Sequence, residues 1–268
     1  MQSAATHRPD PRLFQIGSLA VLLAVNIAWF DLGARPLQSA VTIAATLAAQ
    51  ALFCRAFGVG FDWRSAVITG LSLSLLLRTN EPALWGAAGV LAIGSKFLIR
   101  VRGKHLFNPA AFAIVVLLLL GDGRVWVSPG QWGAQVWLGL LVAATGTLVL
   151  TRSSRIDTAL AFILCYGGLL LWRAAVLGDP LAIPLHQLQT GSLLIFTCFM
   201  ITDPRSTPDR RAGRLLFAAL VALLAYRLQF TEQLRTALYF ALMAGSLATP
   251  LIDLVLPAAR FRWRTQEA

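Results

Sequence analysis

Ten apolar segments follow one another through this chain and constrain its fold more than any other feature. A helix needs roughly 20 apolar residues to cross the hydrocarbon core of a bilayer, and most of these runs are close to that length. The sequence therefore predicts an all-α polytopic membrane protein with about ten transmembrane helices and the lipid bilayer as its surroundings. The segments are expected at 13–31, 36–54, 64–79, 82–99, 108–121, 133–151, 156–177, 187–203, 212–230 and 234–256.

The composition excludes two other classes of protein. Of the 268 residues 57% are hydrophobic and 13% are charged, whereas about 25% of a soluble globular chain is charged. The net charge of +11 raises nucleic acid as a partner. The arginines, however, stand in short loops between apolar runs and do not follow one helix face, so we expect no nucleic-acid binding.

The basic residues predict the orientation of the chain. Lys and Arg are enriched in cytoplasmic loops, and with a cytoplasmic N-terminus sixteen of them fall in inner loops or tails and six in outer loops. We therefore expect a multi-pass protein of the inner (plasma) membrane with both termini cytoplasmic. Residues 1–12 are polar and no small-residue cleavage site follows the first apolar run, so this run is expected to remain as an anchor.

A weak internal repeat divides the chain, which we treat as a single membrane domain over residues 1–268. Thr79-Asn80-Glu81-Pro82 ends the third segment and Thr202-Asp203-Pro204 ends the eighth. Five segments per half is an odd number, so halves at about 13–121 and 133–256 must face opposite ways, as in inverted-repeat transporters. Chance recurrence of so short a pattern is the alternative.

The junction after the eighth segment combines charge, polarity and backbone breaks. Asp203 precedes Pro204, and the basic stretch that follows contains Pro208 and Gly213. One interpretation is that the Asp203 carboxylate caps a turn by accepting backbone N–H groups. The other is that it holds a ligand.

Three stretches carry a resemblance to a known family. Residues 103–110 (GKHLFNPA), residues 199–207 followed by 213–217, and residues 249–253 (TPLID) resemble motifs of the RnfD/NqrB family. This family comprises membrane subunits of ion-pumping NADH:ferredoxin and NADH:quinone oxidoreductases. The resemblance implies ten segments in two inverted halves and other membrane subunits of a redox complex as partners.

The resemblance also implies flavins held in the membrane, one of them an FMN joined through its phosphate to a threonine after the fifth segment. Here that connection is only residues 121–132 and contains no threonine, so we expect no covalent FMN. A flavin, riboflavin or FMN, or a quinone bound noncovalently is expected instead. In this interpretation the cofactor-binding residues are Arg78, Thr79, Lys104, Asn108, Thr202 and Asp203.

Little else in the sequence points to chemistry. Cys54, Cys165 and Cys198 are isolated in apolar segments, so no metal or iron–sulfur site is expected. No nucleotide-binding loop is present, and NADH chemistry would need a partner protein. Lys96 and Asp253 are interpreted as ligand candidates or, with slight preference, as side chains that snorkel to the interface. The tryptophans near segment ends, Trp126 among them, are interpreted as interfacial anchors.

Two functions of other classes remain open. The same scaffold could serve as a small-molecule transporter or export protein without redox work. The short chain is also similar to a divergent branch encoded with enediyne biosynthesis, for which transport or resistance has been supposed. A third interpretation is an accessory protein of the complex that only scaffolds its partners.

Overall fold

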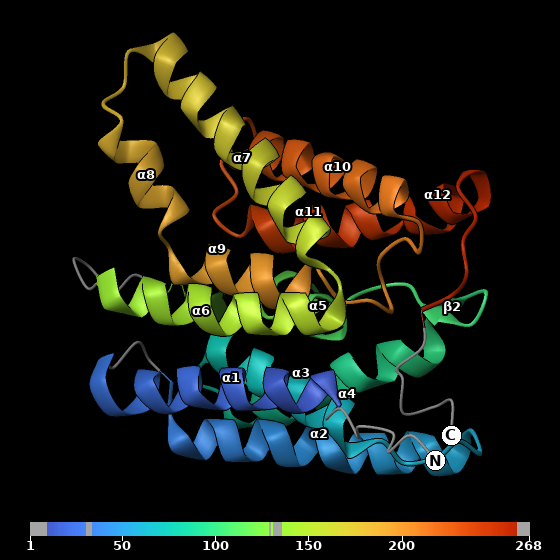
Figure 1. The fold of residues 1–268 in the computed structure, drawn as a ribbon. Coiled ribbons are helices and arrows are strands. Elements are labelled where there is room, and N and C mark those ends of the chain that lie inside the picture. The colour runs from blue at the N-terminus through green and yellow to red at the C-terminus, as the bar shows by residue number, and fades with distance from the viewer. Residues whose placement is uncertain (1–9, 31–33, 129, 131–135, 262–268) are drawn as a thin grey trace, which may run out of the picture.

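The computed structural model describes residues 10–30, 34–128, 130 and 136–261, and helices make up most of this part of the chain (Figure 1). The all-α class is confirmed. Residues 1–9 and 262–268, which include both termini and most of the polar stretch before the first apolar segment, lie outside the described residues, as does much of the predicted start of the sixth segment. The helices are α1 (Pro11–Val25) with the π-helical η1 (Asn26–Phe30), α2 (Pro36–Ala56), α3 (Trp63–Leu76), α4 (Pro82–Leu98), α5 (Pro109–Leu120), α6 (Val136–Ser153), α7 (Ile156–Leu177), α8 (Ala182–Leu188), α9 (Gly191–Ile195) with the π-helical η2 (Phe196–Met200), α10 (Arg211–Phe230), α11 (Ala237–Ser246) and α12 (Thr249–Val255).

Each predicted segment coincides with apolar helix, but the helices differ in length. Among the described residues, four are long and apolar enough to cross a membrane: Pro11–Trp29, α2, α7 and α10. Together α11 and α12 would make a fifth span, bent by 43°. Helices α3, α4 and α5, with Trp137–Ser153 and Gly191–Met200, are apolar but shorter. The chain is thus a polytopic membrane protein, while ten complete spans remain a prediction.

Four short strands, which the sequence analysis did not predict, form two antiparallel pairs. Strand β1 (Leu77–Thr79) follows α3 and pairs with β4 (Val125–Val127), which follows α5. Strands β2 (Arg100–Val101) and β3 (Lys104–His105) form a hairpin between α4 and α5. The turn of this hairpin has positive φ at Arg102 (51°) and Gly103 (79°). These pairs fix the chain at both ends of α5.

Small residues let the helices of the first half approach closely. A Cβ on Gly70 of α3 would lie 2.8 Å from Oγ1 of Thr46, and one on Gly89 of α4 would lie 3.0 Å from the backbone N of Thr46. Thr46 belongs to a buried polar row on α2 with a spacing of four residues. Without water to drive helices together, such close contacts and interhelical polar groups hold membrane helices in place. The row is Gln38, Thr42, Thr46 and Gln50.

The pattern of helix contacts recurs along the chain. Helix α2 packs on α4 as α7 packs on α10, α4 packs on α5 as α10 packs on α11, and α1 contacts α3 as α6 contacts α9. In Figure 1 the elements α1 to α4 form the lower part and α6 to α12 the upper part, with α5 between them. The opposite direction of the two halves across a membrane remains a prediction.

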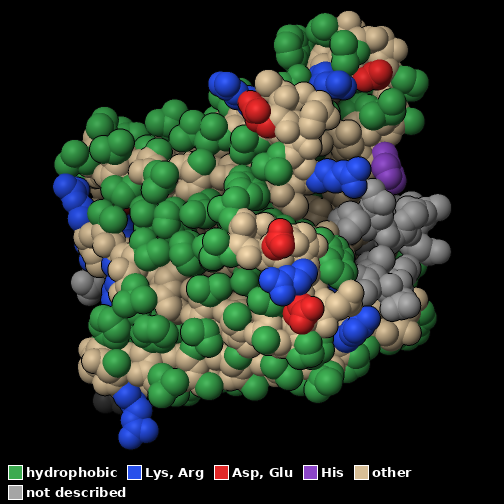
Figure 2. All heavy atoms as spheres, turned by 180° about the vertical axis from the view of Figure 1, so that it is seen from behind, with side chains coloured by type: hydrophobic (Ala, Val, Ile, Leu, Met, Phe, Trp, Pro, Cys, Tyr) green, Lys and Arg blue, Asp and Glu red, His purple; other side chains and the backbone are tan. Residues whose placement is uncertain are grey.

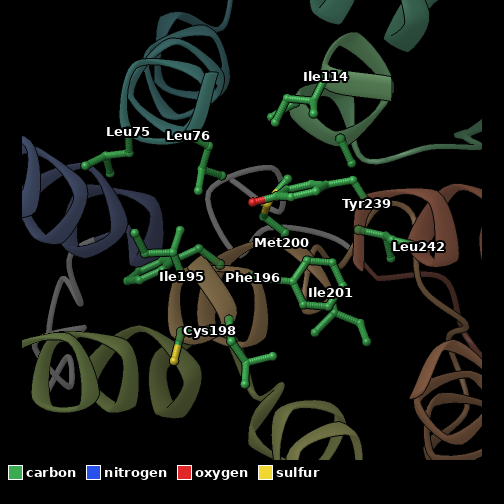
Figure 3. Packing of buried hydrophobic residues seen from close by; sticks show 14 of the residues in the cluster. Leu75, Leu76, Ile114, Ile195, Phe196, Cys198, Met200, Ile201, Tyr239 and Leu242 are labelled. Carbon is green, nitrogen blue, oxygen red and sulfur yellow. The ribbon is translucent and has the colours of Figure 1, made fainter. Parts of the chain in front are cut away.

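The two parts meet in a buried apolar core. Figure 3 shows side chains of α3, α5, α9, η2 and α11 pointing toward one another there. The labelled residues include Leu75, Leu76, Ile114, Phe196 and Tyr239. The outer surface is apolar too: Figure 2 shows a broad face with hydrophobic side chains and few charges, as expected for contact with lipid.

Candidate functional site

The start of α5 is fastened to the end of η2. Asn108 is the N-cap of α5, and its Oδ1 accepts a hydrogen bond from the N–H of Ala111 at 3.1 Å. Its Nδ2 donates to the carbonyl of Met200 at 3.3 Å. Pro109 occupies the first helical turn, where a missing N–H costs nothing. Asn108 thus caps one broken helix and ties it to the other.

Asp203 closes the other side of this junction. Its Oδ1 accepts from the N–H of Arg205 at 3.0 Å, and its Oδ2 lies 3.2 Å from Nε2 of His105. Burial raises the pKa of Asp203, but the charge and hydrogen bond of His105 and the contacts of Arg205 outweigh it and hold the pKa below its usual value. Both a local turn cap and a tertiary partner are therefore present at Asp203. Next to it, Thr202 donates to the carbonyl of Cys198 at 2.8 Å.

Lys104 is the centre of a buried charge cluster. Its Nζ lies 2.9 Å from Oδ2 of Asp253, 3.1 Å from Oδ2 of Asp209 and 2.7 Å from the carbonyl of Thr207. The N–H of Asp209 donates to Oδ1 of Asp253 at 2.9 Å. Lys104 in the β2–β3 hairpin thus joins the hairpin to α12 and to the chain before α10, and its charge is already matched by two carboxylates.

The snorkelling interpretation does not hold for Lys96 or Asp253. Asp253 points inward to Lys104. Nζ of Lys96 donates to Oε1 of Gln50 at 3.0 Å and to Oγ of Ser65 at 2.8 Å. Both groups find polar partners inside the helix bundle, which lowers the cost of keeping a charge away from water.

A second group of ion pairs lies at the same end of the bundle. Arg12 pairs with Asp10 at 2.7 Å and also with Asp62, at the start of α3. Burial raises the pKa of Asp10, but its hydrogen bonds with Arg12 keep it below its usual value. Nη2 of Arg214 lies 2.5 Å from Oδ2 of Asp157. The sequence analysis missed these pairs, because partners far apart in sequence leave no spacing signal.

The junction residues line a small polar cavity, here named the inner-end cavity, of about 80 Å³. A typical ligand pocket has roughly 300–1,000 Å³, so this space suits water or a small ion better than a flavin ring. Its polar lining includes Arg12, Ser72, His105, Asn108, Thr202 and Asp203. Lys104 lies outside this lining and faces a crevice of about 30 Å³ with Asp253.

Arg78 and Thr79 lie at the opposite end of α5. They belong to β1, which pairs with β4 after α5, whereas Asn108 precedes α5. A helix of 12 residues separates the two places by about 18 Å. Arg78 is buried, and its guanidinium donates to the carbonyls of Ser74, Leu75 and Leu77 at 2.8–3.0 Å. Thr79 accepts from the N–H of Glu81 at 3.1 Å. The six predicted site residues therefore form no single pocket.

A larger cavity, the outer-end cavity, lies beside β4 and has a volume of about 840 Å³. It is bounded by α7, by α8 and α9, and by the chain that joins α10 to α11, at the end where α8 projects from the body (Figure 1). Among its described lining residues, Arg235 alone is charged. The aromatic and polar side chains that line it include Trp126, Tyr166, Gln187, Gln229, Phe230, Gln233, Arg235 and Tyr239.

Two tyrosines give the outer-end cavity polar groups in an otherwise apolar wall. The hydroxyl of Tyr166 donates to Oε1 of Gln229. The hydroxyl of Tyr239 is buried and has no hydrogen-bond partner among the described residues. The sequence analysis interpreted Trp126 only as an interfacial anchor and missed this cavity. Its walls come from four separate stretches, each of which alone resembles an ordinary helix end.

The whole chain was compared with known proteins. The family model described as the NQR2, RnfD, RnfE family matches residues 12–262. The chain belongs to this family. The stretches that carried the resemblance, including Asn108 and Asp203, lie within the match.

Three relatives share one name, which makes each of them the same component of an ion-translocating oxidoreductase complex. The protein from Pseudomonas paraeruginosa is 29% identical, over 85% of this chain and 81% of its own length. The one from Halorhodospira halophila is 26% identical, over 80% of each chain. The one from Cronobacter sakazakii is 23% identical, over 94% of this chain and 95% of its own. The similarity thus extends over most of each protein.

Proposed function

We propose that this chain is a membrane-embedded component of an ion-translocating electron-transport complex and that it binds a flavin noncovalently in the outer-end cavity. Membership of the NQR2, RnfD, RnfE family and the relatives from ion-translocating oxidoreductase complexes support the first part. The single observation that carries the second is the size and lining of the cavity. In this proposal other membrane proteins of the complex are its partners.

The residues around the outer-end cavity fit a flavin. Its volume of about 840 Å³ lies within the range of small-molecule sites. Trp126 and Phe230 offer flat apolar faces, and Gln229 and Gln233 offer amides to the polar edge of a ring. The buried hydroxyl of Tyr239 has a hydrogen bond to give. A bound flavin would supply the capacity to accept and pass on electrons.

We assign the flavin to this cavity and not to Lys104, Asn108, Thr202 and Asp203. The space at the last three is about 80 Å³, and the charge of Lys104 is matched by Asp209 and Asp253. Arg78 and Thr79 lie at the same end of α5 as the outer-end cavity, in the strand paired with β4. Their role in this proposal is to hold Trp126 of β4 in place.

We further propose that the end carrying Arg12, Lys104 and Asp203 is cytoplasmic and that the protein lies in the inner membrane. Arg12 and Asp203 line one cavity, and the N–H of Phe261 donates to Oδ1 of Asp209 at 3.2 Å. Both described ends of the chain therefore lie at this end. The excess of Lys and Arg predicted for inner loops supports its placement on the cytoplasmic side.

A transporter is the second candidate, and one observation favours it. The inner-end and outer-end cavities lie at opposite ends of α5 and are separated by the packed core in Figure 3. Alternating access in inverted-repeat transporters uses openings on the two sides of such a barrier. In that case the cavity would hold the transported molecule and no flavin.

An absorption spectrum of the protein purified in detergent, after addition and removal of excess FMN or riboflavin, separates the two candidates. We expect flavin absorbance that stays with the folded protein, is released by acid and leaves no fluorescent band after denaturing electrophoresis. Trp126→Leu and Gln229→Ala should lower flavin occupancy, while Arg227→Gln, an exposed change at the same end, should not. A flavin-free protein that moves solutes into liposomes would support the transporter.

A further inference from the structure

Three exposed arginines gather around the turn of the β2–β3 hairpin, and we name Arg100, Arg102 and Arg260 the hairpin arginine cluster. Nη2 of Arg100 donates to the carbonyl of Gly103 at 2.9 Å. Nη1 of Arg260 lies 2.9 Å from the position that a Cβ on Gly103 would take. Arg102 is the other turn residue. Two guanidinium groups therefore lie against one glycine, and the third extends from the residue before it.

The carboxylates closest to the hairpin in the fold are already engaged. Asp209 and Asp253 both bind Nζ of Lys104, and Asp209 also accepts from the backbone of Phe261. Within the described part of the chain, no carboxylate lies within 4.0 Å of any arginine of the cluster. The cluster is thus a concentration of positive charge without an acidic partner.

The cluster stands where two apolar helices end. Leu98, the last residue of α4, is 67% exposed, and Val255, the last residue of α12, is 75% exposed. Val101 of the hairpin is exposed as well. Exposed apolar side chains at helix ends in a membrane protein face acyl chains, so the arginines lie at the level of the lipid headgroups.

We infer that the hairpin arginine cluster binds the phosphate of an anionic phospholipid whose acyl chains lie against the adjacent helix ends. Guanidinium groups bind phosphate oxygens in pairs and with charge-assisted hydrogen bonds. Basic sites on the cytoplasmic side of membrane proteins bind anionic headgroups in this way. Topology alone requires arginines on one side of the membrane, but it does not require three of them on one turn, two against a single glycine.

The test is binding of phosphatidylglycerol, with phosphatidylcholine as the neutral lipid, to the full-length protein in detergent, followed by native mass spectrometry. We expect one tightly bound phosphatidylglycerol. The double variant Arg100→Gln/Arg260→Gln should bind it at least about tenfold more weakly, as expected for two arginines beside an anionic headgroup. Arg260→Gln alone should show a smaller loss and guards against a folding defect, which size-exclusion chromatography would reveal.

A charge-matched control uses Arg55→Gln/Arg210→Gln, two exposed arginines at the same end without a carboxylate partner among the described residues. We expect less than about a twofold change in this control. An equal loss in both double variants would show general attraction to charge and overturn the site. Displacement of the lipid by an equal concentration of glycerol 3-phosphate would show a site for free phosphate, and the lipid assignment would then be wrong.

Discussion

Nε2 of His105 lies 3.2 Å from Oδ2 of Asp203, although 98 positions separate the two residues in the chain. His105 ends the hairpin before α5, and Asp203 follows the π-helical end of the helix that opens at Gly191. The contact therefore joins the two helix breaks on which the family resemblance rests. It also makes Asp203 a group whose protonation is coupled to folding.

Stability should fall on acidification through Asp203. Its pKa in the folded protein lies below its usual value of 3.8, so the carboxylate stabilises the fold above that value and loses this contribution as the pH falls through the folded-state pKa. Asp203→Asn should lower the unfolding temperature at pH 7 and reduce its dependence on pH below about 5. Unfolding curves in detergent between pH 7 and 3 test this, and an unchanged acid dependence in the variant would contradict it.

Removing Lys104 should destabilise the protein strongly. Lys104→Met would leave Asp209 and Asp253 buried next to each other without a cation, and breaking such a pair costs about 3–5 kcal/mol. The control is Arg173→Gln, because Arg173 and Asp179 form a pair at 3.3 Å that is one-third exposed. That change should cost less than about 1 kcal/mol. Chemical unfolding of both variants measures the difference, and equal losses would show that the Lys104 cluster is solvated.

The contact of α2 with α4 should depend on one glycine. In Gly89→Ala the new methyl group would lie 3.0 Å from the backbone N of Thr46, so the helices must move apart, at a cost of roughly 1–3 kcal/mol. Gly86→Ala changes the same helix one turn earlier, where a Cβ meets nothing within 4 Å. This control should be neutral or slightly stabilising. The two unfolding temperatures decide the matter, and a loss in Gly86→Ala alone would reverse it.

The apolar periodicity predicts helix positions well but not their interruptions. The predicted segment 36–54 and the observed helix Pro36–Ala56 differ by two residues at one end, and the segment 156–177 is matched completely. The last segment, predicted as one helix over 234–256, is broken before Pro250. The π-helical turns and the strands were not predicted, because tertiary packing and not local preference decides them.

The candidate site divides in the same way. Inverted topology predicts that Asn108 and Asp203 lie on the same side of the bundle, and the structure places both on the inner-end cavity. The grouping of Arg78 with them could not be tested by spacing, since it depends on which ends of α5 the strands reach. His105 and Arg235 gave no signal, because an isolated histidine or loop arginine has no spacing from which a partner follows.

Cysteine labelling should report the orientation of the chain. Ser128 and Ser206, natural choices in their loops, are buried and unsuitable. Arg102 and Glu232 are exposed at opposite ends. In a background with Cys165→Ser, we expect an impermeant thiol reagent to modify Glu232→Cys in intact cells and Arg102→Cys only after permeabilisation. The reverse pattern would place the hairpin outside.

Asn108 and Asp203 should be energetically coupled through one carbonyl group. The carbonyl of Met200 accepts from Nδ2 of Asn108 at 3.3 Å and from the N–H of Asp203 at 3.2 Å. Asn108→Ala removes the first bond and also the cap on Ala111, which alone is worth about 1 kcal/mol. Asp203→Ala removes the contacts with His105 and Arg205 and loosens the same turn.

Each single variant should therefore insert into the membrane but lose stability, and each should impair the same activity of the complex or the same transport. The double variant should lose less than the sum of the two, by about 0.5–3 kcal/mol, because either change already frees the junction at Met200. A control cycle between Asn108→Ala and Gly86→Ala, far from Met200 in the fold, should be additive. Strict additivity of the Asn108 and Asp203 losses would mean that the two residues are separate helix caps.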